Sequence, residues 1–345
     1  MNNSQKISCY FAAANGYNGF RSYFNSVFSP ESYARLYILK GGPGTGKSSI
    51  MKKIRENFND KGLKTETILC SSDPASLDGV IVRSQNKKIA VIDGTAPHQT
   101  DPKFPGSVDE IINIGNSWNR DILISQREKI ISINELKALH YKKAYDYLKQ
   151  AGEYHKYRSN VELKDIDNPK LSFLFNLPSK NQSRIPKIKL LSSFGKAGYQ
   201  TLKDIDFSEN EIIYITGTPQ TKNSYMTRIK EEADKKGVYY TLIPSPFSQD
   251  IIEGIYFEDN GILVSTKFNS KLQIDTNFHD LKISLELDEK AHNNIYEQLL
   301  TSSENEFALA SEAHFLLEKI YTAAMDFEDI NRTCENLILD MENFL

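Results

Sequence analysis

Eight residues, GGPGTGKS at positions 41–48, combine the residue types that bind a phosphate chain. They satisfy G-x-x-x-x-G-K-[ST], the Walker A pattern, and they stand between an apolar run at 35–40 and a helical pattern at 46–60. Glycines let successive backbone N–H groups curl around phosphate oxygens, and the following helix presents its positive end to the same anion. The segment therefore predicts a nucleotide-binding loop.

The residues of this loop have expected roles toward ATP and Mg²⁺. Lys47 is expected to reach the β- and γ-phosphates and act in catalysis, and the Ser48 hydroxyl to ligate the metal. Asp93 ends the apolar run IAVID and is the expected Walker B aspartate, a second metal ligand with a catalytic role. Capping the next element is the alternative role for Asp93. The nucleotide-binding residues are expected to be Gly41, Gly42, Pro43, Gly44, Thr45, Gly46, Lys47, Ser48 and Ser49.

The residue after Asp93 is Gly94, where many ATP-driven motors place a water-activating glutamate. This disfavours a fast motor ATPase, and the attacking group must be positioned from elsewhere. His98 and Asp101 follow in the proline-rich segment 93–106, at the carboxyl end of a predicted strand, where ligands bind in open α/β sheets. Both are candidate catalytic residues, and a hydrogen-bonded loop histidine is the alternative for His98.

Two other pairs of polar residues have both a chemical and a structural interpretation. Asp73 and Asp78 follow the predicted strand at 64–70, and Asp73 is explained at least as well as a helix N-cap. His314 and Glu318 stand four residues apart, which places them on one face of a predicted helix. That spacing suits a metal or substrate contact, and an ordinary surface pair is the simpler alternative.

A second loop, GTPQTKNS at 217–224, looks like a disabled copy of the first. Lys222 replaces the second glycine of the pattern, and Asn223 replaces its lysine. The strand that corresponds to IAVID ends in the neutral residues Ser265 and Thr266. The second loop is therefore predicted to be a pseudo-site, and a weak phosphate contact from Lys222 is the alternative.

The two loops belong to an internal repeat. Four pairs of segments recur in the same order at offsets of about 170 to 176 residues, which indicates duplication of one unit. We expect a P-loop NTPase domain with intact Walker A and B motifs at 1–166, a proline-rich connector at 167–190, and a degenerate P-loop domain at 191–345.

The expected fold class is α/β, with two duplicated P-loop NTPase domains. Apolar runs at 35–40, 64–70 and 88–93 alternate with a helix at 46–60, which predicts a mostly parallel sheet with flanking helices. Each domain should be followed by long helices, because apolar residues recur at helical spacing through 121–158 and 286–343. These helices are expected to pack beside the sheets or against each other.

The chain also resembles a family of bacterial tandem P-loop proteins that are described as predicted ATPases or ATP-binding proteins. The resemblance covers nearly the whole chain and is carried by KGGPGTGKSSIMKKI, CSSDPASLDGV, VIDGTAPHQTDPKFPGSVDEIINIG and EAHFLLEKIYTAAMDFEDI. It implies motif positions for Lys47, Ser48, Asp93, His98 and Asp101, and a second loop that departs from a working motif. It implies no substrate.

Composition narrows the class of protein further. With 345 residues, 39% of them apolar and 25% charged, the chain is typical of a globular protein of about two domains. A net charge of −3 gives no strong sign of a nucleic-acid partner, and no apolar run is long enough for a membrane partner. Three scattered cysteines and the absence of a signal-peptide pattern predict a cytoplasmic location.

The sequence thus predicts an Mg-ATP-binding protein, an ATPase or nucleotide-driven switch with one active site in its N-terminal half. The C-terminal half is expected to be its intramolecular partner, and Arg228 or Arg184 could supply an arginine to the site. The alternative is a kinase that transfers the γ-phosphate to a small-molecule acceptor. A second alternative is a nucleotide-sensing module without significant turnover.

Overall fold

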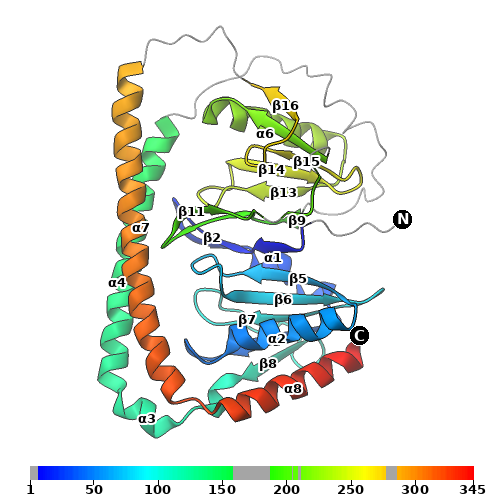
Figure 1. The fold of residues 1–345 in the computed structure, drawn as a ribbon, viewed down its shortest axis with the longest axis vertical. Coiled ribbons are helices and arrows are strands. Elements are labelled where there is room, and N and C mark those ends of the chain that lie inside the picture. The colour runs from blue at the N-terminus through cyan, green and yellow to red at the C-terminus, as the bar shows by residue number, and fades with distance from the viewer. Residues whose placement is uncertain (1–6, 158–186, 204, 209–210, 277–285) are drawn as a thin grey trace.

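A computed structural model describes residues 7–157, 187–203, 205–208, 211–276 and 286–345. It contains two six-stranded mixed sheets with helices packed beside them (Figure 1). The predicted α/β class is therefore confirmed.

The first sheet has the strand order β1-β5-β6-β7-β4-β8. Its strands are β1 (Cys9–Phe11), β4 (Arg35–Lys40), β5 (Lys64–Leu69), β6 (Leu77–Arg83), β7 (Lys88–Asp93) and β8 (Asp109–Asn113). Strand β4 lies between β7 and β8 and is parallel to both. Strand β6 is antiparallel to both of its neighbours, so the sheet is mixed, where the sequence suggested a mostly parallel one. Its connections to β5 and β7 are short, whereas a parallel crossover needs a dozen or more residues.

The second sheet has the order β16-β12-β15-β14-β13-β9. Its strands are β9 (Lys187–Ile188), β12 (Ile212–Thr216), β13 (Thr241–Pro244), β14 (Ile252–Phe257), β15 (Ile262–Ser265) and β16 (Leu272–Asp275). Read from β9, this order repeats that of the first sheet read from β1, and β14 is the antiparallel strand that corresponds to β6. The two sheets therefore share one topology.

The layers follow from which face of each sheet is covered. Helices α2 (Lys47–Asp60) and α8 (Phe327–Phe344) cover one face of the first sheet, and α6 (Pro219–Lys235) covers the outer face of the second. The remaining two faces contribute to one core cluster together with α1 (Phe24–Val27), and the 3₁₀ turn η1 (Pro30–Ser32) follows α1. Figure 1 shows this stack, from α6 through both sheets to α2 and α8.

The two sheets meet through reciprocal contacts. Phe11, the last residue of β1, and Leu190, two residues beyond β9, exchange both backbone hydrogen bonds, at 2.9 and 3.1 Å. Beside them pack two hairpins, β2 (Ala13–Gly16) with β3 (Gly19–Ser22) and β10 (Ser192–Gly195) with β11 (Gly198–Thr201). Contacts in which each partner uses the same position are those of a two-fold interface, here within one chain.

Long helices run along one side of both sheets (Figure 1). After the 3₁₀ turn η2 (Ile114–Ser117), α3 (Arg120–Ser125) leads into α4 (Arg127–Tyr157), which packs against α7 (Glu286–Ala323). His140 Nδ1 lies 2.6 Å from Glu306 Oε2, and the Ser303 hydroxyl donates to the Ala144 carbonyl at 2.9 Å. The expected helices at 121–158 and 286–343 are thus each interrupted once, and they pack against each other across the two halves.

Two elements cross the domain limits predicted from the sequence. Most of the predicted connector, residues 167–186, lies outside the described residues, whereas 187–188 form β9 of the second sheet. Helix α8, assigned by sequence to the second domain, packs on the first sheet. None of the helices within the described ranges combines the length and the apolar character that a membrane crossing requires.

Candidate functional site

The loop 41–48 leaves strand β4, which lies between β7 and the edge strand β8, and enters helix α2. Gly44 and Gly46 have φ of +67° and +91°, a left-handed conformation that residues with a Cβ adopt with strain. Gly46 is the N-cap of α2 and provides no side chain to the first backbone N–H groups of the helix. Those donors point at the position where the sequence predicts a phosphate group.

Lys47 and Asp93 are brought together because β7 lies beside β4 in the sheet. The Lys47 ammonium lies 3.7 Å from Asp93 Oδ2 and donates to the carbonyls of Gly41 and Gly42 at 3.0 and 2.7 Å. Lys47 is nearly buried, so the cation rests inside the loop that the sequence assigns to phosphates.

Three carboxylates surround this cation. Burial lowers the pKa of Lys47. The three carboxylates raise it, Asp93 most strongly, followed by Asp78 and Glu318. The pKa of Glu318 is lowered first by its hydrogen bond to His314, and further by the charges of His314 and Lys47. The loop is therefore a site of concentrated charge on a partly buried surface.

Ser48 and Asp93 supply the oxygen atoms that the sequence assigns to Mg²⁺. Ser48 Oγ accepts a hydrogen bond from the Leu77 backbone N–H at 3.0 Å, which leaves its hydroxyl hydrogen unassigned. Asp93 Oδ1 accepts from the Thr95 backbone and hydroxyl at 2.9 and 2.5 Å, so Oδ2 is the oxygen that faces Lys47. Among the described residues no cluster of three or more His, Cys, Asp or Glu side chains forms a metal site. A hydroxyl and one carboxylate suit Mg²⁺ only together with phosphate oxygens and water.

The end of α7 lies directly against this loop. A Cβ at Gly42 would lie 2.9 Å from the Tyr321 ring, and a Cβ at Gly44 would lie 2.7 Å from the Glu318 carbonyl oxygen. The Thr322 hydroxyl donates to the Gly44 carbonyl at 3.1 Å. The glycines thus serve a second purpose, because they admit a helix from the other half of the chain.

The elbow between α7 and α8, residues 324–326, is tied to the segment after β8. The Asn119 N–H donates to the Ala324 carbonyl at 2.7 Å, and the Asp326 N–H donates to the Ser117 carbonyl at 2.8 Å. The segment 117–119 therefore holds the end of α7 in place beside the loop.

The hairpin of the second half supplies another charge near the site. Lys196, in the turn between β10 and β11, lies 3.4 Å from the Asp73 carboxylate and contributes to the lowered pKa of Glu318. Of the two arginines suggested by sequence, Arg228 belongs to α6 and Arg184 lies outside the described residues. Lys196 was not singled out by sequence, since a lysine in a hairpin turn is ordinary.

His98 and Asp101 occupy different surroundings. His98 is buried, with Nε2 3.0 Å from Asp78 Oδ2, its ring stacked on Phe24, and Nδ1 without a hydrogen-bond partner among the described residues. Asp101 is 90% exposed and lies 3.4 Å from the Lys40 ammonium. Of the four predicted catalytic residues, the structure brings only Lys47 and Asp93 into direct proximity.

A pocket of about 490 Å³ opens beside the loop, at the carboxyl ends of β4, β7 and β8. It is lined by Lys40, Gly41, Gly94, Thr95, Ala96, Gln99, Asp101, Asn113 and Trp118. Trp118, which packs against Tyr321 at a ring distance of 5.9 Å, connects this pocket to the elbow. The pocket is mainly polar and is continuous with the first residue of the loop.

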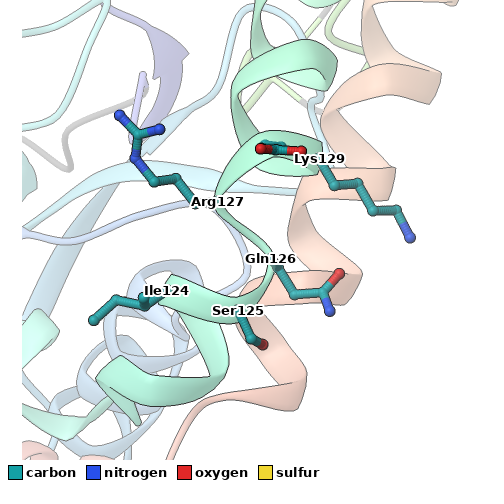
Figure 2. A pocket seen from close by; sticks show the side chains of 6 residues that line it. Ile124, Ser125, Gln126, Arg127 and Lys129 are labelled. Carbon is teal, nitrogen blue, oxygen red and sulfur yellow. The ribbon is translucent and has the colours of Figure 1, made fainter.

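A second hollow, of about 430 Å³, lies where α3 meets α4. Figure 2 shows that its walls come from the single stretch 124–129, with Arg127 and Lys129 pointing away from one another. Because these side chains diverge, the hollow has no set of groups directed at one ligand.

The second loop folds differently from the first. Helix α6 begins at Pro219, directly after Gly217 and Thr218, whereas α2 begins only at Lys47. The Thr218 hydroxyl accepts from the Thr221 N–H at 3.2 Å and so caps the helix. Asn223 donates to the Asp250 carbonyl and accepts from the Ile252 N–H. Residues that form an open arch in the first loop are helical here, and a side chain occupies the helix end.

Comparisons with protein-family models, with curated proteins and with solved structures found no match to this chain. The resemblance to bacterial tandem P-loop proteins therefore stays a prediction from the sequence.

Proposed function

We propose that this chain binds Mg-ATP at the loop 41–48 and hydrolyses it, with one active site per chain. The observation that carries the proposal is the pairing of Lys47, at the start of α2, with Asp93, at the end of β7, at 3.7 Å beside a helix N-terminus that has no side-chain cap. A structural glycine turn would need neither a buried lysine nor a carboxylate beside it.

The chain's own groups have distinct roles in this proposal. On nucleotide binding, the Lys47 ammonium exchanges the carbonyls of Gly41 and Gly42 for β- and γ-phosphate oxygens, and the N–H groups at the start of α2 donate to the same phosphates. Ser48 Oγ and Asp93 Oδ2 would hold Mg²⁺. When bound, the metal neutralises charge on the phosphate oxygens.

The repeated topology extends the proposal to the fold. We infer that the chain consists of two duplicated P-loop domains, of which the second has lost its site. The shared strand order of the two sheets supports the duplication, and the capped, prematurely started helix α6 supports the loss.

Trp118 provides a direct test, because it is the chain's single tryptophan and lines the pocket next to Gly41. We expect Mg-ATP to change its fluorescence in a saturable way. Lys47→Ala should weaken that binding by about 10- to 100-fold, the size of one lost hydrogen bond to a charged group. Lys222→Ala, in the second loop, is the matched control and should bind as the wild type does.

Two results would reject this assignment. One is equal weakening of binding by both substitutions in proteins that remain folded. The other is two nucleotides bound per chain in titration calorimetry, because that would require a working second loop.

A phosphotransferase remains the second candidate, and the 490 Å³ pocket beside Gly41 is the observation that favours it. Lys40 and Asp101 could orient a polar acceptor there. ADP formation that depends on an added small molecule would support the kinase, whereas ADP formation in buffer alone would support the ATPase.

A further inference from the structure

Hydrolysis at the proposed site needs a group that activates water, and the residue after Asp93 does not supply one. Gly94 has no side chain, and a Cβ at this position would lie 2.2 Å from Ile38 Cγ2. The buried core below β7 therefore excludes a glutamate from Gly94 without rearrangement of the sheet. The group that activates water must therefore come from another element.

Helix α7 brings a carboxylate to the loop. The backbone of Glu318 is in contact with Gly44, and Tyr321 and Thr322, one turn further along, contact Gly42 and Gly44. Three successive contacts fix the position of this turn of α7 relative to the loop. Any side chain on the same face of α7 is therefore held beside the proposed phosphate site.

The Glu318 side chain has the exposure and the partners expected of a reacting group. It is 40% exposed, so solvent water can reach it, and His314 Nε2 lies 3.5 Å from Glu318 Oε1. The hydrogen bond to His314 lowers the pKa of Glu318 most strongly, and the charges of Lys47 and Lys196 lower it further, so the ionised carboxylate interacts with the lysine of the loop.

We propose that Glu318, supplied by the C-terminal half, is the general base of the site in the N-terminal half. This inference rests on the proposed ATPase function and names the residue that the sequence motif lacks. It also assigns a role to the second half, which contributes α7 although its own loop is closed.

The step it would catalyse is balanced without a further reactant. The water oxygen forms a bond to the γ-phosphorus, and the bond from that phosphorus to the β–γ bridging oxygen breaks, with its electron pair leaving on ADP. A Glu318 carboxylate oxygen takes the proton of the attacking water and later releases it to solvent. His314 acts as a positioning residue, because it holds one carboxylate oxygen and leaves the other for water.

The test compares Glu318→Gln with Glu312→Gln, an exposed glutamate on the same helix. Phosphate release at saturating Mg-ATP and Trp118 fluorescence titration are measured on both variants and on the wild type. We expect Glu318→Gln to lower kcat by about 100-fold or more, the lower range for a general base, and to keep the Kd for Mg-ATP within about twofold. Glu312→Gln should change neither quantity.

Rescue of kcat by an added carboxylate distinguishes a chemical role of Glu318 from a purely structural one. Glu318→Ala should lose kcat similarly and regain part of it when sodium formate is added, whereas Glu312→Ala should not respond to formate. Turnover by Glu318→Gln within about threefold of wild type, or equal losses in kcat and in binding, would overturn the inference while the ATPase assignment stands. A wild-type protein that neither binds nor hydrolyses Mg-ATP would instead reject the proposed function itself.

Discussion

Gly44 is the residue on which the loop and its neighbouring helix both depend. It has a left-handed φ of +67°, and the Glu318 carbonyl oxygen would lie 2.7 Å from its Cβ. The positive φ alone makes a substitution costly, by about 1 to 2 kcal/mol. The close approach of α7 adds a second cost, since neither backbone can move freely.

Gly44→Ala should therefore both destabilise the protein and weaken Mg-ATP binding, by about 10-fold or more, because the distorted loop no longer directs its N–H groups at one point. Urea unfolding and Trp118 fluorescence titration measure the two effects. Gly62→Ala is the matched control, with φ of +75° and nothing within 4 Å of the added Cβ. This variant should lose only the stability that corresponds to the backbone strain. If both variants lost the same stability and bound Mg-ATP equally well, the contact with α7 would not matter for the loop.

The candidate site residues were predictable where a motif fixes both type and place. Lys47 and Ser48 begin α2 after the loop that follows β4, and Asp93 ends the adjacent parallel strand β7, as the motif requires. For His98 the sequence left two interpretations, and the buried ring beside Asp78 and Phe24 has the contacts of the alternative, a hydrogen-bonded loop histidine. The proximity of Glu318 to Lys47 joins positions far apart in the chain, and helical spacing alone does not encode it.

At the level of elements, α8 is an integral part of the first half although it ends the chain. Its buried residues belong to the same core cluster as α2 and strands β4, β6 and β7. Met341 is fully buried in this cluster, whereas Leu339, two residues earlier on the opposite face, is 60% exposed. Helix α8 therefore packs on the sheet that carries the proposed site and belongs to its core.

Met341→Ala should lower the free energy of unfolding by about 2 to 5 kcal/mol, because it removes buried contacts and leaves a cavity. Leu339→Ala should change it by less than about 0.5 kcal/mol. Chemical denaturation followed by circular dichroism checks both values. A similar small effect of the two substitutions would mean that α8 is not packed on the first sheet.

The sequence predicted most elements and less of their arrangement. The strands at 35–40 and 88–93 and the helix at 46–60 were readable, because continuous apolar runs and a glycine loop mark them. The direction of β6 could not be predicted from the sequence, because an apolar run looks the same in a parallel and in an antiparallel strand. The breaks between α3 and α4 and between α7 and α8 were also missed, because the apolar spacing continues across them.

At the level of the whole molecule, the two halves share a buried ionic contact. Glu66 of β5 is buried and lies 3.0 Å from Lys189, just beyond β9, while Arg83 and the Tyr10 hydroxyl also bind its carboxylate. Burial by itself would raise the pKa of Glu66, but Lys189 and Arg83 outweigh it and lower that pKa from 4.5 to about 2. The junction therefore depends on an ionised carboxylate.

This contact predicts an acid-sensitive stability. The folded-state pKa lies below the unfolded value, so the contribution is complete above about pH 4.5 and is lost as the pH falls toward 2, in total on the order of 3 kcal/mol. Urea unfolding midpoints between about pH 6 and pH 3 measure the slope.

Glu66→Gln is the comparison for this slope. It should be less stable at neutral pH by about 3 to 5 kcal/mol, because Lys189 remains buried without its partner, and its stability should fall less steeply on acidification. Parallel pH profiles for the variant and the wild type would contradict the assignment of the titrating group to Glu66.

Helix α7 finally gives the molecule a mechanical property. It has 38 residues, so at 1.5 Å per residue it is a rod of about 57 Å, fixed at one end beside the proposed phosphate loop. A tilt of about 5° at that end would move the far end by about 5 Å, because a stiff lever multiplies a small rotation by its length. Because α7 packs against α4, the two helices would move together, and a tilt at the loop would reach the opposite end of the protein as a displacement of the pair.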